Sequence, residues 1–141
     1  MKSADGLTLD QEILSSGCLD WVDASEVIGI ARNLDSASAL DPADLRDLCI
    51  GVIARLSASG LIEIGELGKD SRFVPWDGSE PENLRRLARE WARRADPYPQ
   101  MWDLFWLNTT PRGDEIGNAI TDWVNADPET RGPAPSVDPA R

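Results

Sequence analysis

The chain has 141 residues, of which 41% are hydrophobic and 28% charged, a length and composition typical of one globular domain. Its 25 acidic and 14 basic side chains give a formal net charge of −11, which disfavours binding to nucleic acid and to anionic membranes. Histidine is absent and no Gly-rich phosphate loop or dinucleotide fingerprint occurs, so we expect neither catalysis nor a cofactor or metal.

Three helices are predicted in the first half of the chain, each starting behind a polar residue that can cap its first amide groups. The predicted ranges are about 9–17, 24–33 and 42–59, and the capping residues are Thr8, Asp23 and Asp41. The third helix is the best marked, because Pro42 occupies the first helical position, where a missing N–H costs nothing. Its apolar stripe runs from Leu45 to Leu56, and Gly60 supplies the left-handed residue that ends it.

Strands and helices alternate in the second half of the chain. The predicted elements are a strand at 61–67, a loop at 68–75 with a candidate extended stretch at 72–74, a helix from Pro81 to about 95, a strand at 104–107 and a helix at about 112–125. From Asp127 onward the chain has four prolines and no apolar run, which predicts a disordered tail over 126–141.

Two stretches carry a resemblance to a known family. The segment from Asp41 to Glu63, which ends in Ser-Gly-Leu-Ile-Glu, resembles the recognition helix and first wing strand of bacterial winged-helix repressors. The segment from Phe105 to Gly113 is similar to the second wing strand, although it is one residue longer before the last helix. The resemblance implies a mainly α (α+β) fold over residues 1–125: a winged-helix-like three-helix core, a wing of two or three strands and a C-terminal helix. Residues 69–101 would be a helical insertion in the wing.

The predicted recognition helix has the wrong charge for DNA. Residues 41–59 contain three acidic side chains, Asp41, Asp44 and Asp47, and two basic ones, Arg46 and Arg55. The three acidic residues lie in the first turns. Carboxylates that face a phosphate backbone oppose the electrostatic attraction on which most DNA affinity depends. We therefore expect DNA reading by this helix to be disfavoured, and the resemblance supports the fold more than the activity.

The first hypothesis is a non-catalytic binding protein that engages a basic protein partner. Small, acidic, tryptophan-rich bacterial chains of this kind look like the immunity proteins that neutralise toxin domains by direct binding, since complementary charge speeds encounter and aromatic anchors slow dissociation. The candidate contact residues are Asp23, Glu26, Asp41, Asp44, Asp47, Trp76 and Trp102. For Trp76 and Trp102 the alternative is that they fasten the inserted helix to the core.

The second hypothesis is a winged-helix transcription regulator, which forms a homodimer through its inserted or last helix. It would bind DNA through Arg46, Arg55 and the arginines of the inserted helix. The candidate anion-binding residues of that helix are Arg85, Arg86, Arg89, Arg93 and Arg94. The alternative for this cluster is that it offsets the acidic remainder of the chain through surface pairs.

The other tryptophans and both cysteines are predicted to lie inside the fold. The tryptophans whose spacing points inward are Trp21, Trp91, Trp106 and Trp123. Cys18 and Cys49 lie among apolar neighbours, and buried thiols without an activating base behave as small hydrophobic groups. The expected location is the cytoplasm, because no apolar run approaches the ~18 residues of a membrane span and the first residues lack signal-peptide order.

Overall fold

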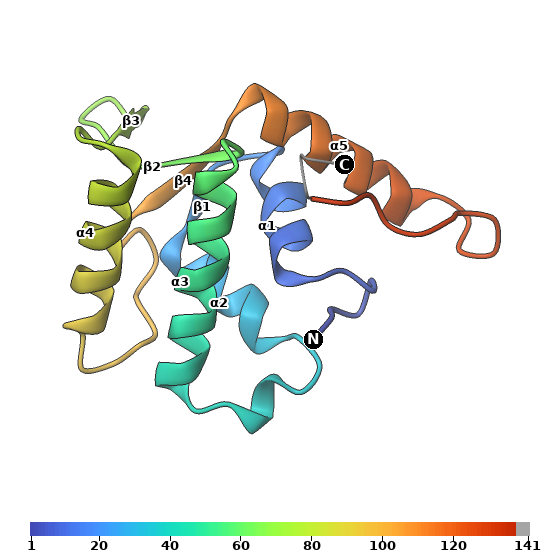
Figure 1. Cartoon of the computed structure of the whole chain (residues 1–141), viewed down its shortest axis with the longest axis horizontal. Helices are drawn as coiled ribbons and strands as arrows, with labels where there is room; N and C mark the ends of the chain where they lie inside the picture. Colours follow the sequence, from blue (N-terminus) through green and yellow to red (C-terminus); the bar gives the residue numbers. More distant parts are fainter. Residues whose placement is uncertain (138–141) are drawn as a thin grey trace.

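A computed structural model describes residues 1–137 of the chain as an α+β fold, in which helices pack against an antiparallel sheet (Figure 1). The elements in chain order are α1 (Leu9–Gly17), β1 (Val22–Asp23), α2 (Ala24–Arg32), the short 3-10 helix η1 (Ala37–Ala39), α3 (Pro42–Ala58), β2 (Ile62–Leu67), β3 (Phe73–Pro75), α4 (Glu80–Ala92), β4 (Trp106–Thr109) and α5 (Pro111–Asn125). The five predicted helices are therefore confirmed, with ends that differ by at most three residues.

Side-chain caps decide where the helices begin. Asp23 and Asp41 accept hydrogen bonds from the backbone N–H groups three residues further on, as predicted, and the Thr8 N–H donates to the Gln11 side chain over 2.9 Å. The sequence predicted the start of α4 at Pro81, one residue late, because its capping residues were not identified. Ser79 and Glu82 form a capping box there, which places the first helical residue at Glu80.

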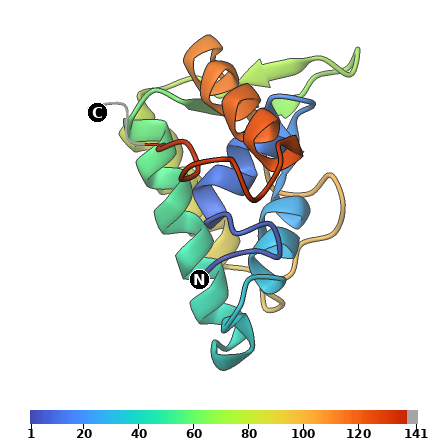
Figure 2. The same cartoon turned by 90° about the vertical axis from the view of Figure 1, so that its right-hand side faces the viewer.

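The sheet has the strand order β1-β4-β2-β3, and all its pairs are antiparallel. Alternation along the strands directs one set of side chains into the core; the buried members include Val22, Ile62, Ile64 and Leu107. β4 begins two residues later than predicted, because Leu104 has a left-handed backbone (φ +70°) that an extended strand cannot accommodate. The loop between α4 and β4 lies on the side of the molecule away from α3 (Figure 2).

Two glycines allow α5 to lie directly against its neighbours. A Cβ atom at Gly113 would be 2.1 Å from the Leu61 carbonyl oxygen, and one at Gly117 would be 2.3 Å from that of Leu14. Real contacts are never so short, so the side chain of any other residue would push α5 away from α1 and from the start of β2. This contact fixes the last helix on the core beside the buried Ile120.

The segment between β2 and β4 is part of the core. α4 packs along α3 (Figure 1), and Leu87 and Trp91 are buried with the residues of the first three helices. The indole of Trp91 meets the ring of Phe105 edge-on, with 5.5 Å between ring centroids, and its N–H donates to the Pro97 carbonyl over 2.8 Å. The inserted helix therefore stabilises the same hydrophobic core as the rest of the chain.

The tryptophans predicted to lie inside differ in burial. Trp91 is fully buried, whereas Trp21, Trp106 and Trp123 are half-buried. Cys49 is buried, and this burial raises the pKa of its thiol to about 12, so it remains protonated at neutral pH. Cys18 is half-buried, and its thiol donates to the Ser15 carbonyl.

The predicted tail returns along the helices as far as the structure describes it. Residues 127–137 contain no helix or strand, but the Trp123 indole N–H donates to the Gly132 carbonyl and the Arg131 guanidinium lies 3.6 Å from the centre of the Trp123 ring. The Gln11 side chain also donates to the Pro135 carbonyl over 2.9 Å. Residues 138–141 of the predicted tail lie outside the described residues.

We expect Gly117→Ala to lower the free energy of unfolding by about 2 kcal/mol, because overpacking at a tight helix contact costs ~1–3 kcal/mol. Gly51→Ala is the matched control, since Gly51 lies inside α3 and a Cβ atom added there would have no neighbour within 4 Å outside its own helix backbone. The control should raise the free energy of unfolding by ~0.4–1 kcal/mol. Urea unfolding measures both changes, and equal effects of the two variants would contradict the close contact between α1 and α5.

Candidate functional site

The structure separates the predicted contact residues into three places. Asp23, Glu26 and Trp102 come together at the start of α2. Asp41, Asp44 and Asp47 lie at the start of α3, beyond the other end of α2. Trp76 lies under α4, so the residues do not form one continuous surface.

Two of the seven predicted contact residues are not available to a partner. The Asp23 side chain is only 4% exposed, and Trp76 is 6% exposed. The guanidinium of Arg86 covers the Trp76 ring at 3.7 Å from its centre. The burial of Trp76 beneath Arg86 favours the alternative, that it fastens the inserted helix to the core, over the prediction that it anchors an interface.

Asp23 is a positioning residue, contrary to the prediction that it contacts a partner directly. One carboxylate oxygen accepts hydrogen bonds from the Ser25 hydroxyl (2.8 Å) and the Glu26 N–H (2.9 Å). The other oxygen accepts from the Trp102 N–H over 2.7 Å. A single buried carboxylate thus caps α2 and holds a turn that is 79 residues distant in sequence. Hydrogen bonds to an ionised, buried acceptor are among the stronger ones in proteins.

That turn, residues 100–105, presents an exposed indole on an unfavourable backbone. We call it the Trp102 turn. Trp102 is 72% exposed, and its φ of +69° is in the left-handed region that favours glycine. Leu104 has a φ of +70°. Non-glycine residues in such conformations cost ~1–3 kcal/mol each and persist only where the surroundings hold them.

Hydrogen bonds from two distant elements hold the Trp102 turn. Asp23, at the end of β1, holds it from one side, and the Arg94 guanidinium, just beyond α4, donates to both carboxylate oxygens of Asp103, over 2.6 and 3.0 Å. These bonds, followed by the Leu104 N–H, hold the pKa of the Asp103 carboxyl below its ordinary value. Two separate anchors therefore fix a backbone that the sequence alone does not favour.

A hollow of about 350 Å³ lies beside the exposed indole. Its walls are formed by Glu66, Leu67, Trp102, Leu104, Phe105 and Trp106. It lies where the pairing between β2 and β4 ends. Gly65 is the last residue of β2 that pairs with β4, and Glu66 and Leu67 pair only with β3. Glu66 is exposed and forms no salt bridge with the part of the chain that the structure describes.

Negative charge is concentrated at the start of α2, next to the Trp102 turn. The pKa of the Glu26 carboxyl is raised above its ordinary value by partial burial, and further by the neighbouring charges of Asp23 and Asp20. Partial burial and like charges this close both disfavour ionisation, so the charged form of Glu26 lowers the stability of the fold.

The exposed stripe of α3 is one residue wide along most of the helix and carries two acidic side chains and one basic side chain. Its members are Asp44, Asp47, Gly51, Arg55 and Ala58. The neighbouring Arg46 pairs with Asp47 at 3.0 Å, and Arg55 pairs with Asp10 at 3.5 Å. Because α1, α2 and α4 all contact α3, this stripe is the surface through which α3 can meet another molecule.

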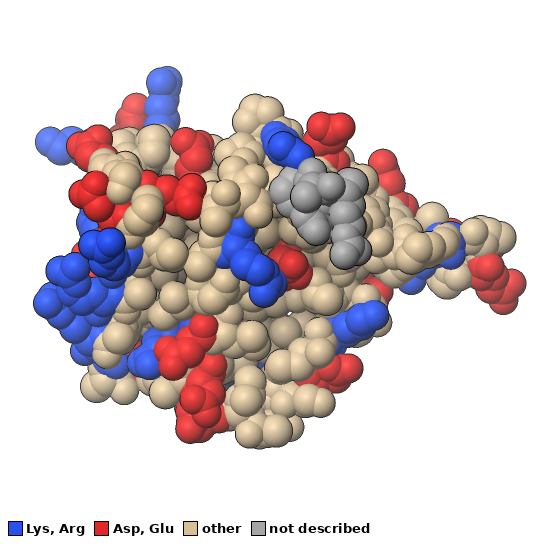
Figure 3. Space-filling model, in the orientation of Figure 1, with Lys and Arg blue, Asp and Glu red and all other residues tan. Residues whose placement is uncertain are grey.

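The five predicted anion-binding arginines of the inserted helix also separate. Arg94 is held by Asp103, and Arg86 pairs with Glu90 at 3.1 Å while covering Trp76. Arg85, Arg89 and Arg93 are exposed at intervals of four residues and form no ion pair with residues 1–137. Figure 3 shows lysine and arginine side chains gathered over α4.

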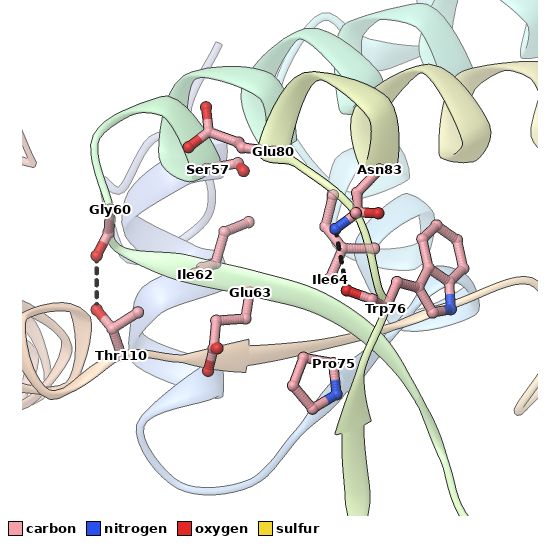
Figure 4. A pocket seen from close by; sticks show the side chains of 11 residues that line it. Ser57, Gly60, Ile62, Glu63, Ile64, Pro75, Trp76, Glu80, Asn83 and Thr110 are labelled. Atoms are coloured by element: carbon pink, nitrogen blue, oxygen red, sulfur yellow. Dashed lines mark hydrogen bonds between the residues drawn. The ribbon is translucent and has the colours of Figure 1, made fainter.

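A second pocket, of about 300 Å³, lies between the end of α3, β2 and the start of α4 (Figure 4). Its walls include the hydroxyl of Ser57 and the carboxylates of Glu63 and Glu80. No hydrogen bond joins Ser57 to Glu80, so these side chains do not form the nucleophile–base pair that covalent catalysis needs. Trp76 also lines the pocket, and its buried indole N–H has no hydrogen-bond partner among the described residues.

Within residues 1–137, no three Cys, Asp or Glu side chains are arranged to hold a metal ion, and none of the helices is long and apolar enough to cross a membrane. No protein-family model, curated protein or solved structure matches the chain.

We expect Asp23→Asn to release the Trp102 turn while leaving α2 capped. The single amide oxygen of asparagine can accept the Glu26 N–H, but its NH₂ group then faces the Trp102 N–H, donor against donor. Amide hydrogen exchange at residues 101–104 should speed up at least tenfold, and the free energy of unfolding should fall by about 1.5–3 kcal/mol. Unchanged exchange in the turn would contradict the role of Asp23.

Glu26→Gln should stabilise the protein at pH 7. Because the pKa of Glu26 is raised in the folded state, its charged form opposes folding above that pKa, and the penalty disappears as the pH falls through it towards the ordinary value. We expect a gain of about 0.5 kcal/mol at pH 7 that vanishes near pH 4. Thermal unfolding from pH 4 to 8 measures it, with Glu115→Gln on α5 as the control; a gain that is independent of pH would refute the proposed cause.

Proposed function

We propose that this protein is a non-catalytic binding protein that engages a basic protein partner through the surface centred on Trp102. The observation that carries the proposal is the exposed indole of Trp102, held on a left-handed backbone by the buried carboxylate of Asp23. Folding alone gains little from such a side chain, since its ring lies mostly in water. A binding role accounts for why the strain is kept.

The Trp102 turn has the properties of an interface anchor. Tryptophan is enriched among the residues that dominate binding energy, and a rigid anchor loses little conformational entropy when it is covered. Anchoring at Asp23 and Arg94 provides that rigidity. The adjoining hollow gives the partner a concave surface next to a projecting one.

The charge around this anchor favours a basic partner. Asp23 bonds both the Glu26 N–H and the Trp102 turn, and Asp20 lies close enough to Glu26 to raise its pKa. Glu66 lines the hollow, and the whole chain carries a net charge of −11. The exposed Asp44 on α3 adds to the same field, whereas Asp47 is paired with Arg46. Complementary charge of this kind speeds the encounter with a cationic protein and discriminates against anionic ones.

Within this class we propose an immunity-type protein, whose partner is a basic bacterial toxin domain. A protein that neutralises a toxin by occupying its surface needs affinity for the toxin but no catalytic groups. A surface built from an aromatic anchor and carboxylates agrees with such a role. Such a protein would act in the cytoplasm, where it would meet the toxin before the toxin meets its target.

Capture from a lysate of the source cells tests the proposal, with the full chain and its Trp102 variants as baits. The wild type should retain a basic protein that Trp102→Ala and Trp102→Gly both lose. That protein should arrest growth when expressed alone and not when this chain is co-expressed. The proposal would be refuted if the wild type captured no basic protein, or if both variants captured the same basic protein equally well.

Trp102→Gly carries a second expectation. Glycine adopts a φ of +69° without strain, whereas alanine does not. The free energy of unfolding of Trp102→Gly should therefore exceed that of Trp102→Ala by about 1 kcal/mol, although both variants lose the partner. Urea unfolding of the two variants measures the difference. Equal stability would mean that the backbone at Trp102 carries no strain.

A winged-helix DNA-binding regulator is the second candidate, and the topology favours it. The element order α1-β1-α2-α3-β2, with β4 between β1 and β2 in the sheet, agrees with a winged helix whose wing contains β3 and α4. α3 would then be the recognition helix. Exposed Asp44 and Asp47 near its start, and α4 packed along it, oppose that role.

Fluorescence anisotropy with duplex DNA at low salt discriminates between the two candidates. We expect no binding at micromolar protein. Binding with a steep salt dependence that is lost in the triple variant Arg85→Ala, Arg89→Ala, Arg93→Ala would replace the first candidate with the second. These arginines lie on α4 and at its C-cap and form no ion pair with residues 1–137.

A further inference from the structure

We infer that the hollow beside Trp102 binds a cationic side chain, an arginine or a lysine, of the partner. The inference rests on the proposed function and deepens it, because it states which chemical group of a basic protein this surface recognises. The hollow is lined by Trp102 and Trp106 with the carboxylate of Glu66.

The chain itself shows how its aromatic rings are covered elsewhere. An arginine guanidinium lies over Trp76 at 3.7 Å, over Trp123 at 3.6 Å and over Tyr98 at 4.5 Å from the ring centre. Trp91 is fully buried against Phe105, and Trp21 lies against Phe73 with 6.3 Å between centroids. Within the described part of the chain, neither Trp102 nor Trp106 has a cation over its ring. These two rings lie at the hollow, where a partner can supply the cation.

Glu66 makes the hollow selective for positive charge. It stands at the end of β2, where its carboxylate has no ion-pair partner among residues 1–137. An aromatic face attracts a cation through its quadrupole, and a nearby carboxylate adds a direct electrostatic term. A neutral apolar side chain would gain only from the indoles, and an anion would be repelled by Glu66.

The size and neighbourhood of the hollow agree with one long side chain. Its volume of about 350 Å³ is at the lower end of the range for ligand sites, too small for a folded segment. Arg94, which anchors the Trp102 turn, is itself held by Asp103 through two hydrogen bonds. The hollow therefore remains open to a cation from outside.

Titration of the full chain with Nα-acetyl-arginine amide tests the inference, with the isosteric neutral Nα-acetyl-citrulline amide as control. Indole ¹H–¹⁵N NMR signals report each tryptophan separately. We expect saturable shifts of the Trp102 and Trp106 signals with the arginine compound at low ionic strength and none with citrulline. Glu66→Gln should weaken binding about threefold, and Trp102→Ala about tenfold. Equal shifts with both compounds, or titrations unchanged in Glu66→Gln, would overturn the inference.

The same variants separate this inference from the proposed function. If a captured basic protein loses affinity with Trp102→Gly but not with Glu66→Gln, the function stands and the cation site in the hollow is refuted. If the arginine compound binds the hollow but no basic protein is captured, the cation site stands and the proposed function falls.

Discussion

The surface around Trp102 depends on one buried carboxylate, that of Asp23. Asp23 ends the two-residue strand β1, caps α2 with one oxygen and holds the Trp102 N–H with the other. Because capping α2 fixes the position of the Asp23 carboxylate, it also fixes the position of the Trp102 turn, whose N–H donates to the second oxygen. Loss of this interaction would leave the core intact and remove the constraint that keeps the indole of Trp102 in a fixed place.

Local sequence signals predicted the helices well, because their causes are local. Asp23 and Asp41 as caps and Gly60 as the stop of α3 act within a few residues of the ends that they define. The predicted start of β4 is two residues too early, because Leu104 has a left-handed backbone in a turn that is held by Asp23 and Arg94, residues remote from the strand in sequence. The close approach of α5 to α1 at Gly117 likewise depends on a tertiary contact that no periodicity displays.

The site could be predicted only in part, and for the same reason. Acidity and tryptophan content predicted a binding surface for a basic partner with Trp102 and Glu26 among its residues, and both belong to the surface that we propose. The sequence predicted Asp23 on that surface as part of the acidic face of the second and third helices, and Trp76 because it flanks the inserted segment and tryptophan is enriched in binding hot spots. Their burial arises from partners remote in sequence, the Trp102 turn and Arg86. Glu66 carried no signal of its own, because a carboxylate at the end of a strand is common until the hollow beside it is seen.

Hydrogen exchange of the complex with a captured basic protein tests the central claim most directly. Binding should slow amide exchange at residues 20–26, 66–67 and 100–106 and leave the exposed face of α4 unchanged. Slowed exchange along α4 and α3, with none in the turn that carries Trp102, would contradict the account.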